Sequence, residues 1–70
     1  MSNWPATKGN RVLAALLRIG WYRKRQTGSH LVLGRNGRLD YVWAFHDRDE
    51  IGPRMLARIG KKTSLKPEDL

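Results

Sequence analysis

The first apolar pattern in the chain is a stripe at helical spacing. Side chains three and four positions apart share one face of an α-helix, so the stripe predicts an amphipathic helix that Gly20 is placed to end. The stripe consists of Val12, Leu13, Leu16, Leu17 and Ile19. The basic residues of the same segment fall on the opposite side of the helix: Lys8, Arg11 and Arg18.

The middle of the chain contains three short segments typical of β-strands. Residues 21–26 begin with aromatic side chains and continue with charged ones, which suits an exposed or edge strand. Residues 29–34 and 39–45 are rich in apolar, β-branched and aromatic side chains. A Thr-Gly pair at 27–28 and an Asn-Gly pair at 36–37 predict the turns between them, and Asn-Gly is the strongest short-range hairpin signal.

A second helix is predicted to begin near Gly52-Pro53, because proline is tolerated at the first position of a helix. Its apolar stripe is short, and Gly60 is expected to weaken its end. Residues 64–70 predict one more turn or a short helix. The stripe comprises Met55, Leu56 and Ile59, and Leu65 and Leu70 are the side chains that would dock the last turn.

The order of these elements predicts the fold class. A helix, three antiparallel strands and a second helix give an α+β fold, α-β-β-β-α, in which two helices cover one face of a three-stranded antiparallel sheet. The 70 residues suffice for a single domain, 1–70, with a thin core. We therefore expect any activity to use a surface groove rather than a deep cavity.

The turn at 36–37 predicts which side chains share each face of the sheet. A two-residue turn pairs Val32 with Tyr41 and His30 with Trp43. A three-residue loop would instead move this register by one step and exchange the faces. The two-residue turn predicts a helix-covered face of Leu31, Leu33, Val42 and Ala44. It predicts an open face of His30, Val32, Tyr41 and Trp43.

The distribution of charge points to a polyanionic partner. Fourteen Lys and Arg against six Asp and Glu give a net charge of +8. Residues 1–39 hold eight of the basic side chains and no acidic one, whereas residues 40–70 hold six of each sign. The positive field is thus concentrated on one part of the molecule, as expected of a nucleic-acid-binding protein. Solubility is the alternative explanation, but solubility alone does not require this segregation.

Composition narrows the other functional classes. The chain has no cysteine and two histidines, so thiolate sites are excluded and a zinc site lacks ligands. The acidic cluster at 47–50 lacks the spacing of a calcium loop. We therefore expect no metal and no cofactor. No segment is apolar enough to span a membrane, and the N-terminus lacks a signal-peptide pattern, which predicts a soluble cytoplasmic protein without membrane contact.

Two segments carry a resemblance to a known family. The sequence Leu-Leu-Arg-Ile-Gly-Trp at 16–21 is followed by Arg-Gln-Thr-Gly-Ser-His at 25–30 and then a strand-turn-strand. This pattern resembles the HicA toxins of bacterial type II toxin–antitoxin systems, over roughly residues 8–70. The resemblance implies a double-stranded-RNA-binding-domain-like fold, ribonuclease activity on mRNA, and neutralisation by a HicB antitoxin. It also implies that His30 is catalytic.

The residues suggest a division of roles for such chemistry. An imidazole can take and return a proton near neutral pH, so His30 could activate a 2′-hydroxyl of RNA. A cationic rim could stabilise charge on the phosphate. The expected rim is Lys24, Arg25 and Arg35, with Ser29 as an additional donor. Tyr41 and Trp43 are expected to stack on bases, to cover a protein partner, or both. The alternative is that His30 is an ordinary half-exposed strand residue.

The role of His46 stays open in the sequence. HicA proteins often have Pro-x-His after the third strand and Gly-Thr at the start of the second helix, where this chain has Ala44-Phe45-His46 and Gly52-Pro53. His46 is either the second half of an acid–base pair or a partner of a carboxylate in the acidic turn that follows, and we favour the latter.

Three functional classes compete at this point. The first is a metal-independent endoribonuclease toxin that cleaves mRNA. The second is a non-catalytic RNA-binding module of the same fold, which would not need a histidine centred on the aromatic face. The third is a small protein-interaction or DNA-binding protein. For the toxin we expect mRNA and an acidic HicB-like antitoxin as partners, with Trp43 anchoring the antitoxin over the open face.

Overall fold

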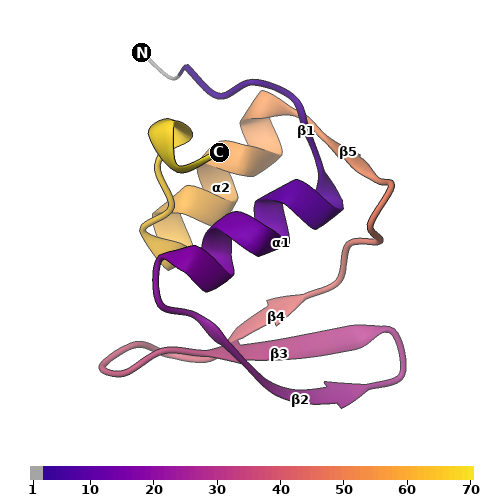
Figure 1. Cartoon of the computed structure of the whole chain (residues 1–70), viewed down its shortest axis with the longest axis vertical. Helices are drawn as coiled ribbons and strands as arrows, with labels where there is room; N and C mark the ends of the chain where they lie inside the picture. The colour runs from indigo at the N-terminus through magenta and orange to yellow at the C-terminus, as the bar shows by residue number, and fades with distance from the viewer. Residues whose placement is uncertain (1–2) are drawn as a thin grey trace.

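The computed structural model describes residues 3–70 and has two helices packed on one side of a three-stranded antiparallel sheet (Figure 1). The sheet has the strand order β2-β3-β4. The elements in chain order are β1 (Thr7–Lys8), α1 (Gly9–Arg18), β2 (Tyr22–Thr27), β3 (His30–Gly34), β4 (Tyr41–Trp43), β5 (Glu50–Ile51), α2 (Pro53–Thr63) and the short 3-10 helix η1 (Pro67–Asp69). The predicted α+β fold class is confirmed, and the arrangement is compatible with that of a double-stranded-RNA-binding domain.

The apolar stripe of α1 faces the sheet as predicted. Val12 and Leu16 are fully buried, and Gly20 takes a φ of +112° just beyond the end of the helix. Such a φ favours glycine, so this residue allows the chain to turn directly into β2. The core joins both helices to the inner side of the sheet. Its buried residues are Val12, Leu13, Ala15, Leu16, Trp21, Leu31, Leu33, Trp43, Ile51, Leu56, Ile59 and Leu65.

Two short features were not predicted by the sequence pattern. β1 and β5 form an antiparallel ladder that pairs Thr7 with Ile51 and Lys8 with Glu50. This ladder ties the segment before α1 to the segment before α2.

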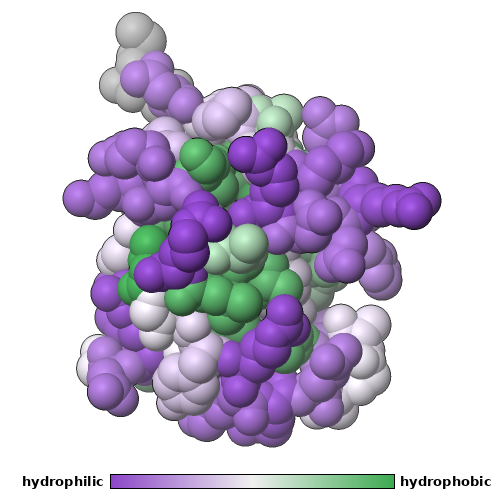
Figure 2. Space-filling model, viewed as in Figure 1, coloured by the Kyte–Doolittle hydropathy of each residue, from purple (hydrophilic) through white to green (hydrophobic). Residues whose placement is uncertain are grey.

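Among residues 3–70, no helix has the length and apolar character needed to cross a bilayer. Hydrophilic side chains cover most of the surface seen in Figure 2 and surround a smaller apolar area near its centre.

The register between β3 and β4 differs from the predicted one by a single step. Leu31 pairs with Trp43, and Leu33 pairs with Tyr41. Directly paired residues lie on the same face of a sheet, so both aromatic side chains face the helices. Val42 faces outward instead and is 54% exposed. The predicted open face that included Tyr41 and Trp43 is therefore wrong, as is the predicted burial of Val42 and Ala44.

The connection between these strands explains the difference. Residues 35–40 connect β3 to β4, whereas the predicted hairpin would use only two residues. Its turn is closed by the Arg38 N–H, which donates to the Arg35 carbonyl at 3.1 Å. Gly37 has a φ of +77°, whereas Asn36 does not have a positive φ, so the two-residue type I′ hairpin is not formed.

Tertiary contacts hold this longer connection in place. The Arg38 guanidinium donates to the Ser64 hydroxyl at 2.6 Å and to the Lys62 carbonyl at 2.9 Å, at the end of α2. The resulting register buries an indole and a phenol ring on the helix side, where the predicted register would bury Val42 and Ala44. Aromatic side chains remove far more apolar area from water, so their burial outweighs the local preference of the Asn-Gly pair.

The C-terminal segment docks on α2 at Gly60. The helix continues past this glycine to Thr63 and is followed by Ser64, which has a φ of +67°. A Cβ on Gly60 would lie 2.7 Å from both the Leu65 carbonyl oxygen and the Trp4 ring. Gly60 therefore permits close packing on both sides of the helix end, rather than merely weakening it. The expected docking of residues 64–70 is confirmed, since Leu65 is buried and Leu70 packs against the core.

The register is tested by comparing Trp43→Ala with Val42→Ala. Trp43→Ala empties a large buried site, and we expect it to lower the free energy of unfolding by about 3–5 kcal/mol. Val42→Ala changes an exposed side chain and should cost less than about 1 kcal/mol. Urea unfolding followed by circular dichroism measures both, and a Trp43→Ala chain unfolded without urea counts as a complete loss. A larger loss for Val42→Ala would support the two-residue hairpin instead.

The role of Gly60 is tested by Gly60→Ala. Alanine is favoured over glycine inside a helix by about 1 kcal/mol. The close contacts should reverse this preference and lower the free energy of unfolding by about 1–3 kcal/mol. The matched control is Gly52→Ala, since no atom lies within 4 Å of a Cβ at Gly52. If thermal denaturation shows Gly60→Ala to be as stable as the wild type, the packing of Trp4 and Leu65 on this helix is not a constraint.

Candidate functional site

His30 is held at the start of β3 by a tight turn. Thr27 pairs with His30 across the two residues Gly28 and Ser29, and Gly28 has a φ of +60°. A positive φ at the first central residue of a two-residue hairpin is the type II′ arrangement, which favours glycine there. The Gly-Ser-His sequence therefore has a structural explanation: Gly28 and Ser29 form the turn, and His30 is the first residue of the strand that follows.

The imidazole of His30 lies on the side of the sheet away from the helices. Leu31 and Leu33 face the core, so alternation along β3 places His30 and Val32 on the opposite side. His30 is exposed, and within residues 3–70 its side chain makes no hydrogen bond or ion pair. Its ring nitrogens are thus accessible to a ligand on this face.

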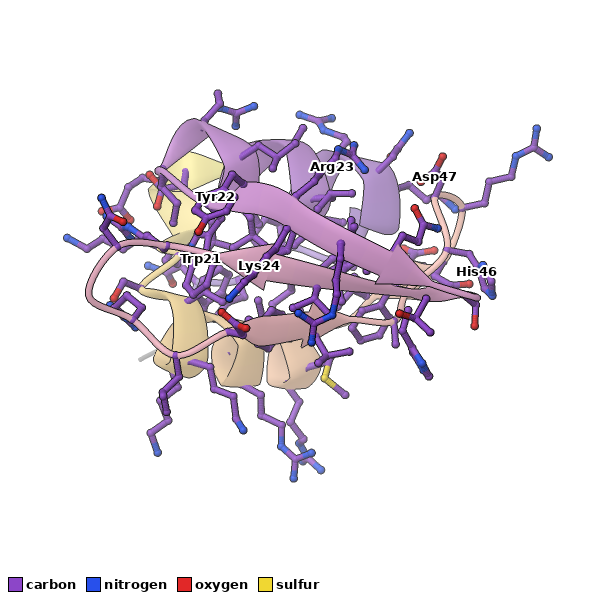
Figure 3. The ribbon with its side chains drawn as sticks, turned by 90° about the horizontal axis from the view of Figure 1, so that it is seen from below. Trp21, Tyr22, Arg23, Lys24, His46 and Asp47 are labelled. Carbon is purple, nitrogen blue, oxygen red and sulfur yellow. The ribbon has the colours of Figure 1, made fainter. Side chains whose placement is uncertain are left out.

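A bulge in β2 gives this face its positive charge. Arg23 pairs with Leu33 and Arg25 pairs with Val32, so Lys24 is an extra residue in the strand. The bulge leaves Lys24 and Arg25 together on the outer side of the sheet, where regular alternation would separate them. We call this surface the open sheet face (Figure 3). It consists of Tyr22, Lys24, Arg25, Thr27, His30, Val32 and Val42.

The predicted cationic rim is only partly assembled. Arg25 is exposed and makes no ion pair within the described part of the chain, and it lies two positions along β2 from the partner of His30. Lys24 donates to both carboxylate oxygens of Asp40, at 2.9 and 3.1 Å, which partly neutralises it. Arg35 lies beside Gly20, beyond the far end of β3. At about 3.3 Å per residue, this places Arg35 roughly 16 Å from His30, so it does not belong to the same site.

The aromatic residue on the open sheet face is one that sequence reasoning missed. Tyr22 is 50% exposed, and its ring lies over Gly34, where a Cβ would come within 2.8 Å of the ring. Two neighbouring aromatic residues, Trp21 and Tyr22, begin this segment and indicated an aromatic side chain here. The sequence pattern does not reveal the bulge in β2, so it could not show which residues of the strand share a face. Trp43, in contrast, is only 3% exposed and lies 5.1 Å from the Phe45 ring. It cannot serve as an anchor on the open sheet face.

Tyr41 also belongs to the interior side. Its ring packs edge-on against Trp21, with centroids 6.4 Å apart. Burial raises the pKa of the Tyr41 hydroxyl above its usual value, so this phenol is neutral at physiological pH. Trp21 is itself buried, and its indole N–H donates to the Thr63 carbonyl at 3.1 Å. The expected exposed stacking platform of Tyr41 and Trp43 is therefore absent from the open sheet face.

His46 lies in the segment that covers the start of α1. Its backbone N–H donates to the Asp49 carboxylate at 2.8 Å, so a neighbouring carboxylate does bind this residue, although through the backbone rather than the imidazole. The N–H groups of Gly9 and Asn10 donate to the carbonyls of Asp49 and Asp47, at 2.7 and 3.0 Å. These bonds satisfy the free donors at the helix start. A Cβ at Gly9 would collide with the His46 carbonyl, so glycine permits this close contact.

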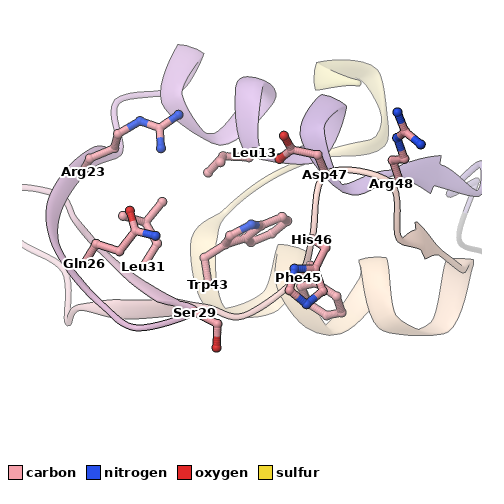
Figure 4. A pocket seen from close by; sticks show the side chains of 10 residues that line it. All are labelled: Leu13, Arg23, Gln26, Ser29, Leu31, Trp43, Phe45, His46, Asp47 and Arg48. Carbon is pink, nitrogen blue, oxygen red and sulfur yellow. The ribbon is translucent and has the colours of Figure 1, made fainter.

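A surface pocket of about 470 Å³ opens between this segment, α1 and the inner side of β2 (Figure 4). We call it the Trp43 pocket. It is lined by Leu13, Arg23, Gln26, Ser29, Leu31, Trp43, Phe45, His46, Asp47 and Arg48. His46 therefore belongs to this pocket on the helix side of the sheet, whereas His30 lies on the open sheet face. Ser29 connects the two, because it lines the pocket and precedes His30 in the chain.

Comparison with known proteins identifies the family. Residues 9–65 match the family described as the HicA toxin of bacterial toxin–antitoxin. No curated protein and no solved structure matches the chain. The matched range begins at the first residue of α1 and ends just beyond α2, so it includes the whole three-stranded sheet, His30 and the residues lining the Trp43 pocket. The chain therefore belongs to the HicA toxin family of bacterial toxin–antitoxin systems.

Proposed function

We propose that the protein is an endoribonuclease toxin that cleaves mRNA, and that His30 is its catalytic residue. The observation that carries the proposal is an exposed imidazole, free of protein partners within residues 3–70, at the end of a cationic sheet face. Membership of the HicA toxin family supports a toxin whose target is RNA. The tight turn before His30 supports a fixed position for the imidazole, because catalysis by proton transfer requires a defined geometry.

The proposed reaction needs a base and a positive charge. A ring nitrogen of His30 takes the proton of an RNA 2′-hydroxyl, and the 2′-oxygen forms a bond to the adjacent phosphorus. The bond from phosphorus to the 5′-oxygen breaks, and that oxygen takes up a proton from the imidazolium or from water. Arg25 stabilises the charge that develops on the phosphate, and the Ser29 hydroxyl or N–H is a further donor close to His30.

We also propose that an acidic HicB-like antitoxin covers the open sheet face. Tyr22 and Val42 expose about half of their side-chain surface there, at 50% and 54%. Arg25 and Lys24 lie on the same face, and opposite fields accelerate association between partners. These exposed apolar side chains replace Trp43 as the expected anchors of the complex. An antitoxin seated on them would cover His30 and exclude RNA from it.

The role of His30 is tested by His30→Ala in the full chain, with Lys61→Ala, an exposed residue of α2 that lines neither surface, as the control. We expect His30→Ala to reduce RNA cleavage at least a hundredfold, since general acid–base catalysis contributes about 10²–10⁴ in rate. Growth arrest on induction should disappear with it, whereas RNA binding should remain. Lys61→Ala should retain cleavage within about tenfold. A His30→Ala protein that still cuts RNA would contradict the catalytic role, and a wild type that binds RNA without cutting it would favour a non-catalytic RNA-binding module.

The chemistry is tested by the ends of the products. Attack by the neighbouring 2′-oxygen predicts a 2′,3′-cyclic phosphate on one fragment and a 5′-hydroxyl on the other, which mass spectrometry of a short RNA distinguishes. Cleavage should also persist in excess chelator, because the proposed steps use only side chains and the substrate. A 5′-phosphate product would mean that water is the nucleophile, and activity lost with chelator and restored by a divalent cation would require a metal-assisted route.

A further inference from the structure

The Trp43 pocket combines an apolar wall with polar groups at its rim. Leu13, Leu31 and Trp43 form the wall, so one side of the pocket is apolar and partly aromatic. Arg23 and Asp47 reach toward the opening from opposite sides, one from β2 and the other from the segment after β4 (Figure 4). A flat ring with polar edges fits such a site, since bases in single-stranded RNA are bound by packing on aromatic side chains and by hydrogen bonds to their edges.

The polar groups at the rim have no side-chain partner within the described residues, 3–70. The ion pairs found within residues 3–70 join Lys8 to Glu50 and Lys24 to Asp40. Neither Arg23 nor Asp47 takes part in an ion pair or a side-chain hydrogen bond in that part of the chain, although they line the same pocket. An unpaired guanidinium and an unpaired carboxylate that face one pocket are a donor and an acceptor available to a ligand.

The chemistry of these two groups selects among the bases. Guanine carries two acceptors, O6 and N7, next to each other, and two donors, N1–H and N2–H, on the adjoining edge. An arginine fork matches the acceptor pair, and a carboxylate matches the donor pair. Adenine and uracil have neither pair, and cytosine has two adjacent acceptors, N3 and O2, but no pair of adjacent donors. Guanine is therefore the base that can form two hydrogen bonds with Arg23 and two with Asp47 at the same time.

The pocket and His30 meet at the same end of the sheet. Gln26 pairs with Leu31, and both line the pocket on the helix side, whereas Thr27 and His30 are the next pair and face the other way. Ser29 lies between them in the turn. An RNA strand that passes around this turn can place a base on one side of the sheet and a neighbouring phosphate on the other.

We propose that the Trp43 pocket binds a guanine base of the RNA and so selects the site of cleavage. The inference rests on the proposed ribonuclease function, because it assigns the pocket to the same substrate strand. Asp47 and Arg23 determine the base, and the apolar wall, in which Trp43 is almost fully buried and Phe45 is partly exposed, provides the surface against which the base packs. His30 acts on the phosphate that lies beyond the turn.

The proposal is tested with four 2′-O-methyl RNA trinucleotides that differ only in the central base, which the enzyme cannot cut at the protected positions. Fluorescence anisotropy with the full chain should show the guanine trinucleotide binding about tenfold more tightly than the other three, the discrimination expected of one good bidentate pair. Asp47→Asn should reduce this preference to less than threefold. The matched control is Glu50→Gln, which removes the same charge from the same acidic turn but does not line the pocket.

A second readout locates the base on the protein. Nuclear magnetic resonance of the Trp43 indole N–H should show a shift with the guanine trinucleotide in the wild type and a smaller one in Asp47→Asn. Equal binding of all four trinucleotides, or equal effects of Asp47→Asn and Glu50→Gln, would overturn the proposal. Cleavage that depends on His30 but shows no guanine preference would reject this pocket assignment alone, whereas guanine-selective binding without cleavage would reject the ribonuclease function and retain the binding site.

Discussion

The burial of Trp43 opposite Leu31 is the contact on which the rest of the structure depends. It sets the register of β3 with β4, because a shift of one residue would turn the indole outward. With the indole inside, the helix side of the sheet is closed by aromatic rings, and the outer side presents Tyr22, Val42 and the cations around His30. The same indole also forms the wall of the Trp43 pocket. The burial of Trp43 therefore determines the composition of both the open sheet face and the Trp43 pocket.

The two surfaces use charge in different ways. On the open sheet face, the bulge in β2 groups Lys24 with Arg25, and Asp40 offsets part of this charge, which leaves Arg25 as the available cation near His30. In the Trp43 pocket, opposite charges face one space and form no ion pair in the part of the chain that the structure describes, which suits a ligand with both donors and acceptors. Phosphate contacts of the first kind give affinity without sequence information, whereas contacts to base edges give specificity.

The segment after β4 links the pocket to the fold. Its carbonyl groups accept hydrogen bonds from the first N–H groups of α1, and Gly9 allows the two backbones to approach closely. This holds His46 and Asp47 at the pocket without using their side chains. The acidic composition of the segment, which in the sequence indicated a partner for His46, is explained mainly by this backbone contact and by the Asp49 carboxylate that closes its turn.

Local patterns in the sequence determined the elements of this protein. The spacing of Val12 and Leu16 determined α1, Pro53 marked the start of α2, and Gly28 with Ser29 determined the turn that presents His30, because each signal acts over a few neighbouring residues. The fold class and the family could be predicted for the same reason. The predicted position of His30 outside the core was also correct, since it depends only on alternation along one strand.

The pairing of strands was decided only by the tertiary structure. The Asn-Gly pair at 36–37 favoured a two-residue hairpin, but Arg38 bonded to the end of α2 and the buried indole of Trp43 stabilised the other register. The bulge at Lys24 and the pocket that unites Arg23 with Asp47 likewise depend on residues distant in the chain. Local signals carry free energies of about 1 kcal/mol, whereas burial of an indole contributes several times as much, so long-range packing determined which side chains share a face.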